Sequence, residues 1–204
     1  QITKEVYLLQ GAGGNIGILT GPDGVFMIDD QFAALSDKLI AAIAKISKQP
    51  VRFLVNTHHH GDHTDGNLAL KERWACIIVG ASHDAERIPG IDQRVSDGDE
   101  YVFGSIAAKV FEVPGHTTGH IAYYFASENI AFVGDTLFAL GCGRLFEGTP
   151  EMMWDSLHKL MTLPDETIVY FGHEYTQANA QFALSVEPGN SQLAARSKEI
   201  DRLR

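Results

Sequence analysis

Short apolar runs rich in β-branched residues, separated by glycine-containing turns, dominate the pattern of hydrophobic and polar positions along the chain. Runs of this length and composition are typical of β-strands. We expect the first three to start a meandering sheet. The predicted strands are residues 6–9, 16–20, 25–28, 51–55, 76–79, 101–103, 107–113, 121–125, 130–133 and 168–171.

Four other stretches are predicted to be helices. Apolar residues recur at helical spacing from Leu35 to Ile46, and Pro50 follows. Thr149 is a suitable N-cap for a second helix, because Pro150 then takes the first helical position. The predicted helices are residues 35–47, 150–161, 177–185 and 191–203.

Length and composition point to one ordinary globular domain. The chain has 204 residues, 45% of them hydrophobic, and its apolar runs are much shorter than the ~20 residues of a membrane span. The formal net charge of −10 argues against a nucleic-acid partner. Cys76 and Cys142 form no CxxC pair, and residues 1–5 lack the pattern of a signal peptide. We therefore expect a cytoplasmic protein without membrane or nucleic-acid partners.

The densest group of histidine and aspartate side chains follows the predicted strand 51–55, where the chain reads Asn56-Thr57-His58-His59-His60-Gly61-Asp62-His63. In an extended segment His58 and His60 point to the same side, while a turn at Gly61 redirects Asp62 and His63. Imidazole and carboxylate groups are the ligands that zinc prefers. One loop can therefore serve two metal ions, and His59, which faces away, is expected to support the site or lie at the surface.

Three later polar clusters also follow strand-like runs and contribute His116, Asp135 and His173. An acidic residue at the end of a buried strand is costly unless cations compensate it, so Asp135 suits a position between two metals. His120 competes with His116, but His116 lies nearer the strand end, and we interpret His120 as a hydrogen-bonding support. Because active sites gather on loops, we expect these groups along one rim of a sheet.

The predicted centre thus holds two metal ions, with Asp135 shared between them. Zinc is the expected metal, and iron or manganese are alternatives in either site. Two cations would lower the pKa of water from ~15.7 to near neutrality, which supplies a nucleophile without Ser or Cys. Asp62 and Asp135 are the candidate catalytic residues. The expected ligands are His58, His60 and His116 for one ion, and Asp62, His63 and His173 for the other.

The HxHxDH segment and the later His, Asp and His resemble those of the metallo-β-lactamase superfamily. The part after about residue 103 is similar to the hydroxyacylglutathione hydrolases (glyoxalase II). The most specific stretch is Gly141-Cys142-Gly143-Arg144-Leu145-Phe146-Glu147-Gly148-Thr149, because metal binding does not require it. The other similar segments are 113–120, 134–138 and 172–176.

This resemblance implies an α/β fold, a four-layer αββα sandwich of two mixed β-sheets flanked by helices. It implies a catalytic domain over residues 1–173 and a short C-terminal helical segment over 174–204. It also implies contacts from Arg144 and Tyr175 to glutathione, and hydrolysis of S-D-lactoylglutathione to D-lactate and glutathione.

Some features favour a different substrate. Gly61 stands where the family usually has a bulky residue, and residues 13–17 and 29–31 look like other branches of the superfamily. A basic glutathione-binding tail and an aromatic hydroxyl near Phe146 are also missing. The alternative is therefore a hydrolase of β-lactams or lactones with the same metals. A non-catalytic metal-binding or electron-transfer module is a third possibility, which a shared carboxylate disfavours.

Overall fold

The computed structural model describes residues 6–104 and 106–203. Residues 1–5, on which the localisation prediction drew, lie outside the described residues. The strands are β1 Val6–Gln10, β2 Asn15–Gly21, β3 Gly24–Ile28, β4 Val51–Val55, β5 Ile77–Ala81, β6 Gln93–Val95, β7 Glu100–Phe103, β8 Ile106–Glu112, β9 Ile121–Phe125, β10 Ile130–Gly134, β11 Leu137–Phe138, β12 Gly141–Cys142 and β13 Ile168–Phe171. The helices are η1 Ala33–Leu35, α1 Ser36–Ile46, α2 Gly61–Thr64, α3 Asn67–Trp74, η2 Ser82–Asp84, α4 Pro150–Leu160, α5 Thr176–Val186 and α6 Ser191–Leu203.

The first sheet has the strand order β1-β2-β3-β4-β5-β6. Its first three strands are antiparallel, as the expected meander requires, and short glycine-containing turns connect them. From β3 to β6 the pairing is parallel, and the long connections that parallel neighbours need are supplied by α1, by α3 and by residues 82–92, which include η2. All of these strands except β6 were predicted from the hydrophobic pattern.

The second sheet has the order β13-β10-β9-β8-β7. Strands β7 to β10 are antiparallel neighbours, and β13 adds in parallel beside β10 after the crossover through α4. Both sheets are therefore mixed, as expected. The parallel pairing of β10 with β13 is important for the site, because it brings the ends of these two strands to the same edge.

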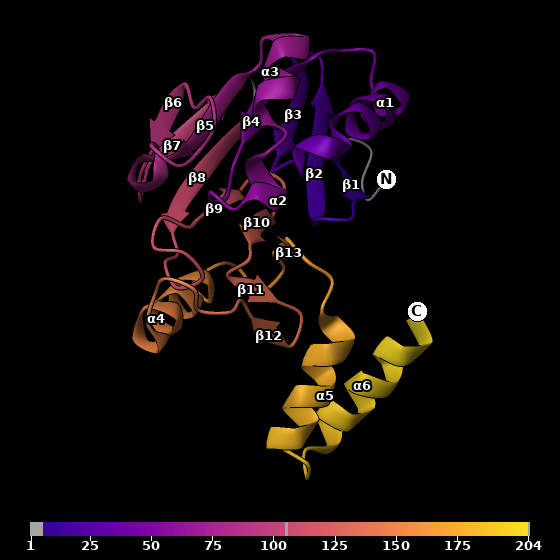
Figure 1. The fold of residues 1–204 in the computed structure, drawn as a ribbon. Coiled ribbons are helices and arrows are strands. Elements are labelled where there is room, and N and C mark those ends of the chain that lie inside the picture. Colours follow the sequence, from indigo (N-terminus) through magenta and orange to yellow (C-terminus); the bar gives the residue numbers. More distant parts are fainter. Residues whose placement is uncertain (1–5, 105, 204) are drawn as a thin grey trace.

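Apolar residues fill three layers between and outside the sheets. Phe26, Val55, Phe103, Tyr123 and Phe125 belong to the cluster between the sheets. A second cluster joins the outer face of the first sheet to α1 and α3, and a third joins the second sheet to α4. Figure 1 shows the resulting layers of helix, sheet, sheet and helix, with α5 and α6 packed against each other at the end of the chain. The expected αββα sandwich is confirmed.

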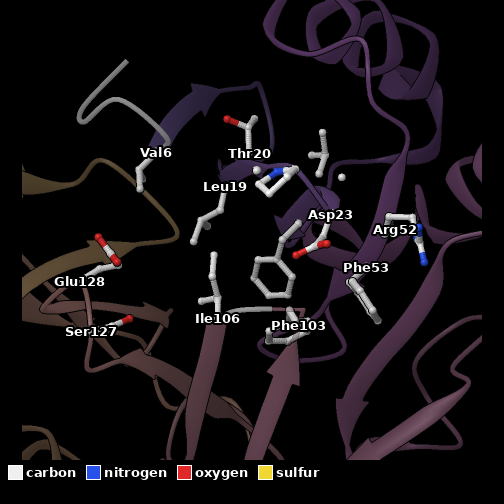
Figure 2. A pocket seen from close by; sticks show the side chains of 15 residues that line it. Val6, Leu19, Thr20, Asp23, Arg52, Phe53, Phe103, Ile106, Ser127 and Glu128 are labelled. Atoms are coloured by element: carbon white, nitrogen blue, oxygen red, sulfur yellow. The ribbon is translucent and has the colours of Figure 1, made fainter.

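A cavity of about 250 Å³ opens between the sheets where β4 begins. Figure 2 shows Phe53, Phe103 and Ile106 in its wall, with Asp23 and Arg52 near its rim. It contains none of the candidate metal-ligand groups of the described residues. None of the helices in residues 6–104 and 106–203 has the length and hydropathy of a membrane span.

Candidate metal centre

The candidate ligands come from the ends of strands in both sheets. The segment with His58 and His60 follows β4, and its last two ligands begin the short helix α2 rather than continuing as a loop. His116 lies between β8 and β9, while Asp135 and His173 follow β10 and β13. The prediction that all the ligands lie along one rim of a single sheet is therefore wrong. They come from strands of both sheets and meet at the edge that the two sheets share.

The structure brings all the predicted metal ligands together. The ligand atoms within each candidate group lie within 4.8 Å of one another. Two groups match the predicted division between two ions, and a third contains the proposed shared carboxylate. The groups are His58, His60 and His116; Asp62, His63 and His173; and His58, His63 and Asp135.

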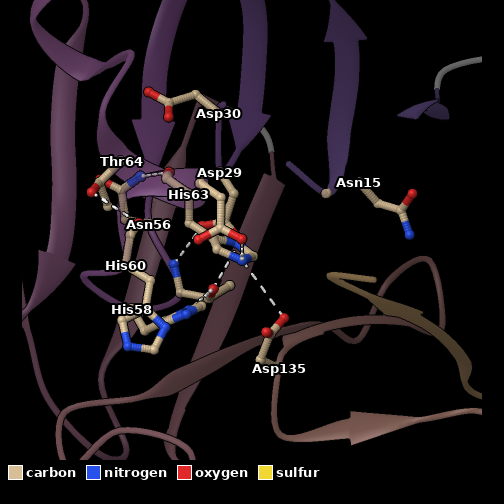
Figure 3. A network of polar contacts seen from close by, with 12 residues as sticks. Asn15, Asp29, Asp30, Asn56, His58, His60, His63, Thr64 and Asp135 are labelled. Carbon is tan, nitrogen blue, oxygen red and sulfur yellow. Dashed lines mark hydrogen bonds and ion pairs between the residues drawn. The ribbon is translucent and has the colours of Figure 1, made fainter. Parts of the chain in front are cut away.

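Asp135 is located between the two predicted triads. Its Oδ2 lies 3.5 Å from His116 Nε2 in one triad and 3.2 Å from His173 Nε2 in the other. Its Oδ1 lies 3.6 Å from His63 Nε2, and Figure 3 shows these two side chains facing each other. A carboxylate in this position is able to contact two cations at once.

Hydrogen bonds behind the cluster orient three of the histidine rings. His63 Nδ1 donates to Asp29 Oδ2 at 2.9 Å, and His116 Nδ1 donates to the Arg144 carbonyl oxygen at 2.8 Å. Thr57 Oγ1 donates to Asp29 and so accepts from His58 Nδ1 at 3.1 Å. With Nδ1 protonated in each ring, the lone pair of Nε2 is left for a metal.

The residues fit a pair of divalent cations on this evidence. His58 Nε2 and Asp135 Oδ1 are buried and have no hydrogen-bond partner among the described residues. Buried polar atoms are normally paired, and unpaired ones at the centre of a ligand cluster are explained by an ion. His63 Nε2 and His173 Nε2 approach to 3.2 Å, which also suits two ligands of one ion.

Without metal, the protonation of the ligand side chains depends on burial and on the charged groups around them. Burial lowers the pKa of His58, His60 and His116, since it disfavours the charged imidazolium. Burial also opposes protonation of His63, but Asp29 and the other carboxylates outweigh it and raise the pKa to about 9. Burial would raise the pKa of Asp135, yet the histidines around it lower the pKa to about 2.

His120 and His59 lie where the sequence analysis expected supporting residues. His120 is buried, which lowers its pKa to about 3, and its Nε2 accepts a hydrogen bond from the Asp135 backbone at 3.0 Å. His59 turns away from the cluster, and its Nδ1 contacts Asp84 Oδ2 at 3.1 Å. His120 is thus placed to hold the Asp135 backbone in position, whereas His59 contacts the carboxylate of Asp84.

Asp29, which anchors His63 and Thr57, was not among the predicted site residues. A signal was available, because Asp29 ends a buried apolar strand in the same way as Asp135. Asp29 accepts from the backbone and the hydroxyl of Thr57 at 2.7 and 2.8 Å. Asp84 was not predicted either, since it follows no predicted strand end and no motif marks it.

A cavity of about 500 Å³ opens directly onto the cluster. Arg144 and Tyr175, the predicted substrate contacts, both line it. The Tyr175 ring stacks on His173 with centroids 5.3 Å apart, and the Arg144 guanidinium lies 5.7 Å from the Phe146 ring. The cavity therefore joins candidate metal ligands to a cation and aromatic surfaces.

Two family models match adjacent parts of the chain. Residues 9–173 match the metallo-beta-lactamase superfamily, and residues 174–204 match the hydroxyacylglutathione hydrolase C-terminus. Among curated proteins, hydroxyacylglutathione hydrolase of Chelativorans sp. (strain BNC1) is 48% identical over 205 residues, covering 100% of this chain and 79% of that protein. Hydroxyacylglutathione hydrolase of Methylococcus capsulatus is 56% identical over 151 residues, covering 74% of this chain and 59% of that protein.

Solved structures share the fold. ETHE1 from Myxococcus xanthus superimposes with a TM-score of 0.72 at 30% identity, over 83% of this chain and 76% of that one. TTHA1623 in a di-iron-bound form superimposes with a TM-score of 0.73 at 25% identity, over 83% of this chain and 92% of that one. The BLEG-1 B3 metallo-beta-lactamase superimposes with a TM-score of 0.74 at 23% identity, over 83% of this chain and 91% of that one. The chain therefore belongs to the metallo-beta-lactamase superfamily and, within it, to the hydroxyacylglutathione hydrolases, which are metal-dependent hydrolases.

Proposed function

We propose that this chain hydrolyses glutathione thioesters of small 2-hydroxy acids, with S-D-lactoylglutathione as the leading substrate and D-lactate and glutathione as products. The observation that carries the proposal is the convergence of the ligand triads around Asp135, beside a cavity lined by Arg144 and Tyr175. The two hydroxyacylglutathione hydrolases that are 48% and 56% identical to this chain support the choice of substrate.

Two metal ions, zinc first and iron or manganese as alternatives, would be held by the triads His58, His60, His116 and Asp62, His63, His173, with Asp135 shared. When bound, they would acidify water and polarise the thioester carbonyl. The di-iron form of a relative with 25% identity keeps iron as a candidate here.

The residues around these ions have separate tasks in the proposed reaction. Asp135 fixes the spacing of the two triads. Asp62, whose side chain is a quarter exposed and whose Oδ2 lies 3.4 Å from His173 Nε2, is placed to accept a proton from the attacking water. As the new carbon–oxygen bond forms, the carbon–sulfur bond breaks and that proton passes to the thiolate sulfur.

Arg144 and Tyr175 serve substrate binding. The guanidinium is suited to a carboxylate of the glutathione part, because it offers several donors in a planar fork. The Tyr175 ring, half exposed and stacked on His173, covers the side of the cavity next to the metal centre. We keep the division into a catalytic domain, 1–173, and a helical segment, 174–204, which the two adjacent family matches support. A cytoplasmic location stays a prediction.

The test compares two substrates on one metal-loaded preparation. The protein is stripped of metal, reloaded separately with zinc, iron and manganese, and assayed with S-D-lactoylglutathione and with a chromogenic cephalosporin. We expect thioester hydrolysis with two ions bound, and its loss in Asp135→Asn but not in the exposed control Asp165→Asn. Hydrolysis of the cephalosporin alone would establish the alternative function. Two bound ions without either activity would indicate a non-catalytic metal module.

A further inference from the structure

The segment 143–148, which we call the cavity segment, joins β12 to α4 without regular secondary structure. It carries Arg144 and Phe146 into the cavity. Its backbone also touches the metal centre, because the Arg144 carbonyl accepts from His116 Nδ1 and the Phe146 amide donates to the His116 carbonyl at 3.2 Å. The position of this segment therefore affects both the substrate contacts and one candidate metal ligand.

Glu147 connects the cavity segment to the rest of the molecule through an ion pair with Arg87. Both terminal nitrogens of Arg87 donate to its carboxylate, Nη1 to Oε1 and Nη2 to Oε2. The backbone amide and hydroxyl of Thr118 donate to Oε2 at 2.8 and 3.0 Å. A two-pronged guanidinium–carboxylate contact of this kind fixes direction as well as distance.

Arg87 also contacts a second carboxylate, that of Asp84. Its Nη2 donates to Asp84, which is fully buried and also contacts His59 Nδ1. His59 separates the candidate ligands His58 and His60. The chain of contacts from His59 through Asp84 and Arg87 to Glu147 thus joins the histidine segment to the cavity segment.

Stability alone does not account for this arrangement. Arg87 and Glu147 keep 36% and 27% of their side-chain surface exposed, and ion pairs with that much water around them contribute little to folding. A buried carboxylate such as Asp84 is costly, and its two partners only compensate that cost. What the contacts do secure is the relative position of the segments that carry His60, His116 and Arg144.

We propose that Glu147, clamped by Arg87, is a positioning residue for substrate binding that keeps Arg144 and Phe146 in place beside the metal centre. The inference rests on the proposed function, because the quantity that Glu147 would set is the affinity for the glutathione part of the thioester. It assigns to Glu147 no contact with the reacting atoms.

The test uses Glu147→Ala, Arg87→Ala and the double variant in the metal-loaded protein. We expect each single variant to raise KM for S-D-lactoylglutathione about tenfold and to change kcat by less than about twofold. Binding of S-methylglutathione, which cannot be hydrolysed, should weaken by the same factor. Because the two residues act as a unit, the double variant should be no worse than either single one. Glu147→Gln, which keeps one oxygen able to accept from both donors of Thr118, should have a smaller effect.

Hydrogen exchange gives a readout that does not depend on turnover. Loss of Glu147 should speed exchange at the amides of Phe146 and Gly148, which donate to the backbone of His116 and Gly115. The matched control is Glu86→Gln, since Glu86 is an exposed partner of Arg94 at 3.8 Å in the same part of the chain. It should change neither KM nor exchange.

Unchanged KM, probe affinity and amide exchange in Glu147→Ala would overturn the inference. So would additive effects in the double variant, or a fall in kcat together with loss of metal, which would indicate a general structural role. If the wild-type protein hydrolyses no glutathione thioester, the proposed function fails. The exchange and probe-binding results would then still decide whether Glu147 positions the cavity segment.

Discussion

His63 donates a hydrogen bond from Nδ1 to Asp29 Oδ2 over 2.9 Å, and both side chains are almost completely buried. Asp29 reaches this position with a positive φ of 58°, directly after β3. Figure 3 shows its carboxylate among the residues behind the candidate metal ligands. The first sheet therefore determines which nitrogen of His63 faces the metal centre.

Replacing Asp29 with Asn should weaken metal binding by about 10- to 100-fold, because partners behind a ligand set its orientation and basicity. Asn is the suitable replacement, since it tolerates the left-handed backbone conformation that Asp29 adopts. Competition with a chelator measures the affinity. The exposed Asp165→Asn should bind metal like the parent chain, and equal affinities in both variants would contradict a supporting role for Asp29.

Metal binding should release a proton at neutral pH. Burial disfavours protonation of His63, but Asp29 foremost and then Asp135 and Asp62 raise the pKa to about 9. The metal-free protein therefore carries this proton at pH 7.5, whereas a ligand must be neutral. From this group alone, affinity should fall about tenfold for each pH unit below 9. Calorimetric titration in two buffers of different ionisation enthalpy measures the release, and a heat that does not depend on the buffer would refute it.

The two cysteines should differ in reactivity in the folded protein. Both are free thiols, and partial burial raises the pKa of each, that of Cys76 to about 11; Cys76 is buried in the core, whereas Cys142 is exposed and lines the cavity at the metal centre. A chromogenic disulfide reagent should modify Cys142 first, and Cys76 only after unfolding. S-methylglutathione should protect Cys142 if it occupies that cavity. Equal rates in Cys142→Ala and the parent chain would show that the reactive thiol was misassigned.

Gly143→Ala should strongly impair activity, because there is no room for a Cβ at this position. A Cβ at this position would overlap the backbone oxygen of Asp135 and lie 3.1 Å from His116 Nδ1. Because those atoms belong to the candidate metal centre, we expect kcat/KM to fall by about 10-fold or more. Gly189 is the matched control, since nothing lies within 4 Å of a Cβ there. Comparable kcat/KM values for Gly143→Ala and Gly189→Ala would show that the close approach is not required.

The hydrophobic pattern predicted strands best where both faces are covered. β10 is buried along its whole length, and its apolar run was recognised directly. β6 was missed, because Gln93 and Arg94 are exposed and only Val95 is buried. α3 was also missed, since its sequence has no apolar stripe and only Asn67 and Leu70 are buried.

The candidate ligands were predictable because each one follows a strand, and strand ends deliver side chains to an edge. Which sheets would share that edge was not predictable, since pairing between distant strands leaves no local pattern. The same holds for Arg87 and Glu147, which are 60 residues apart in the chain and are brought together only by the tertiary structure. Local sequence thus identifies the metal-binding chemistry, whereas the contacts that fix the cavity segment depend on tertiary structure.

The candidate ligands are divided between the two sheets, with His58 to His63 following the first and His116, Asp135 and His173 following the second. Any ion held by residues of both groups would act as a cross-link through the middle of the fold. Ligand binding to the native state alone stabilises it in proportion to the logarithm of free ligand concentration. The resistance of this protein to unfolding would then follow the supply of metal in its surroundings, so that a chelator would loosen the sandwich as well as stop the reaction.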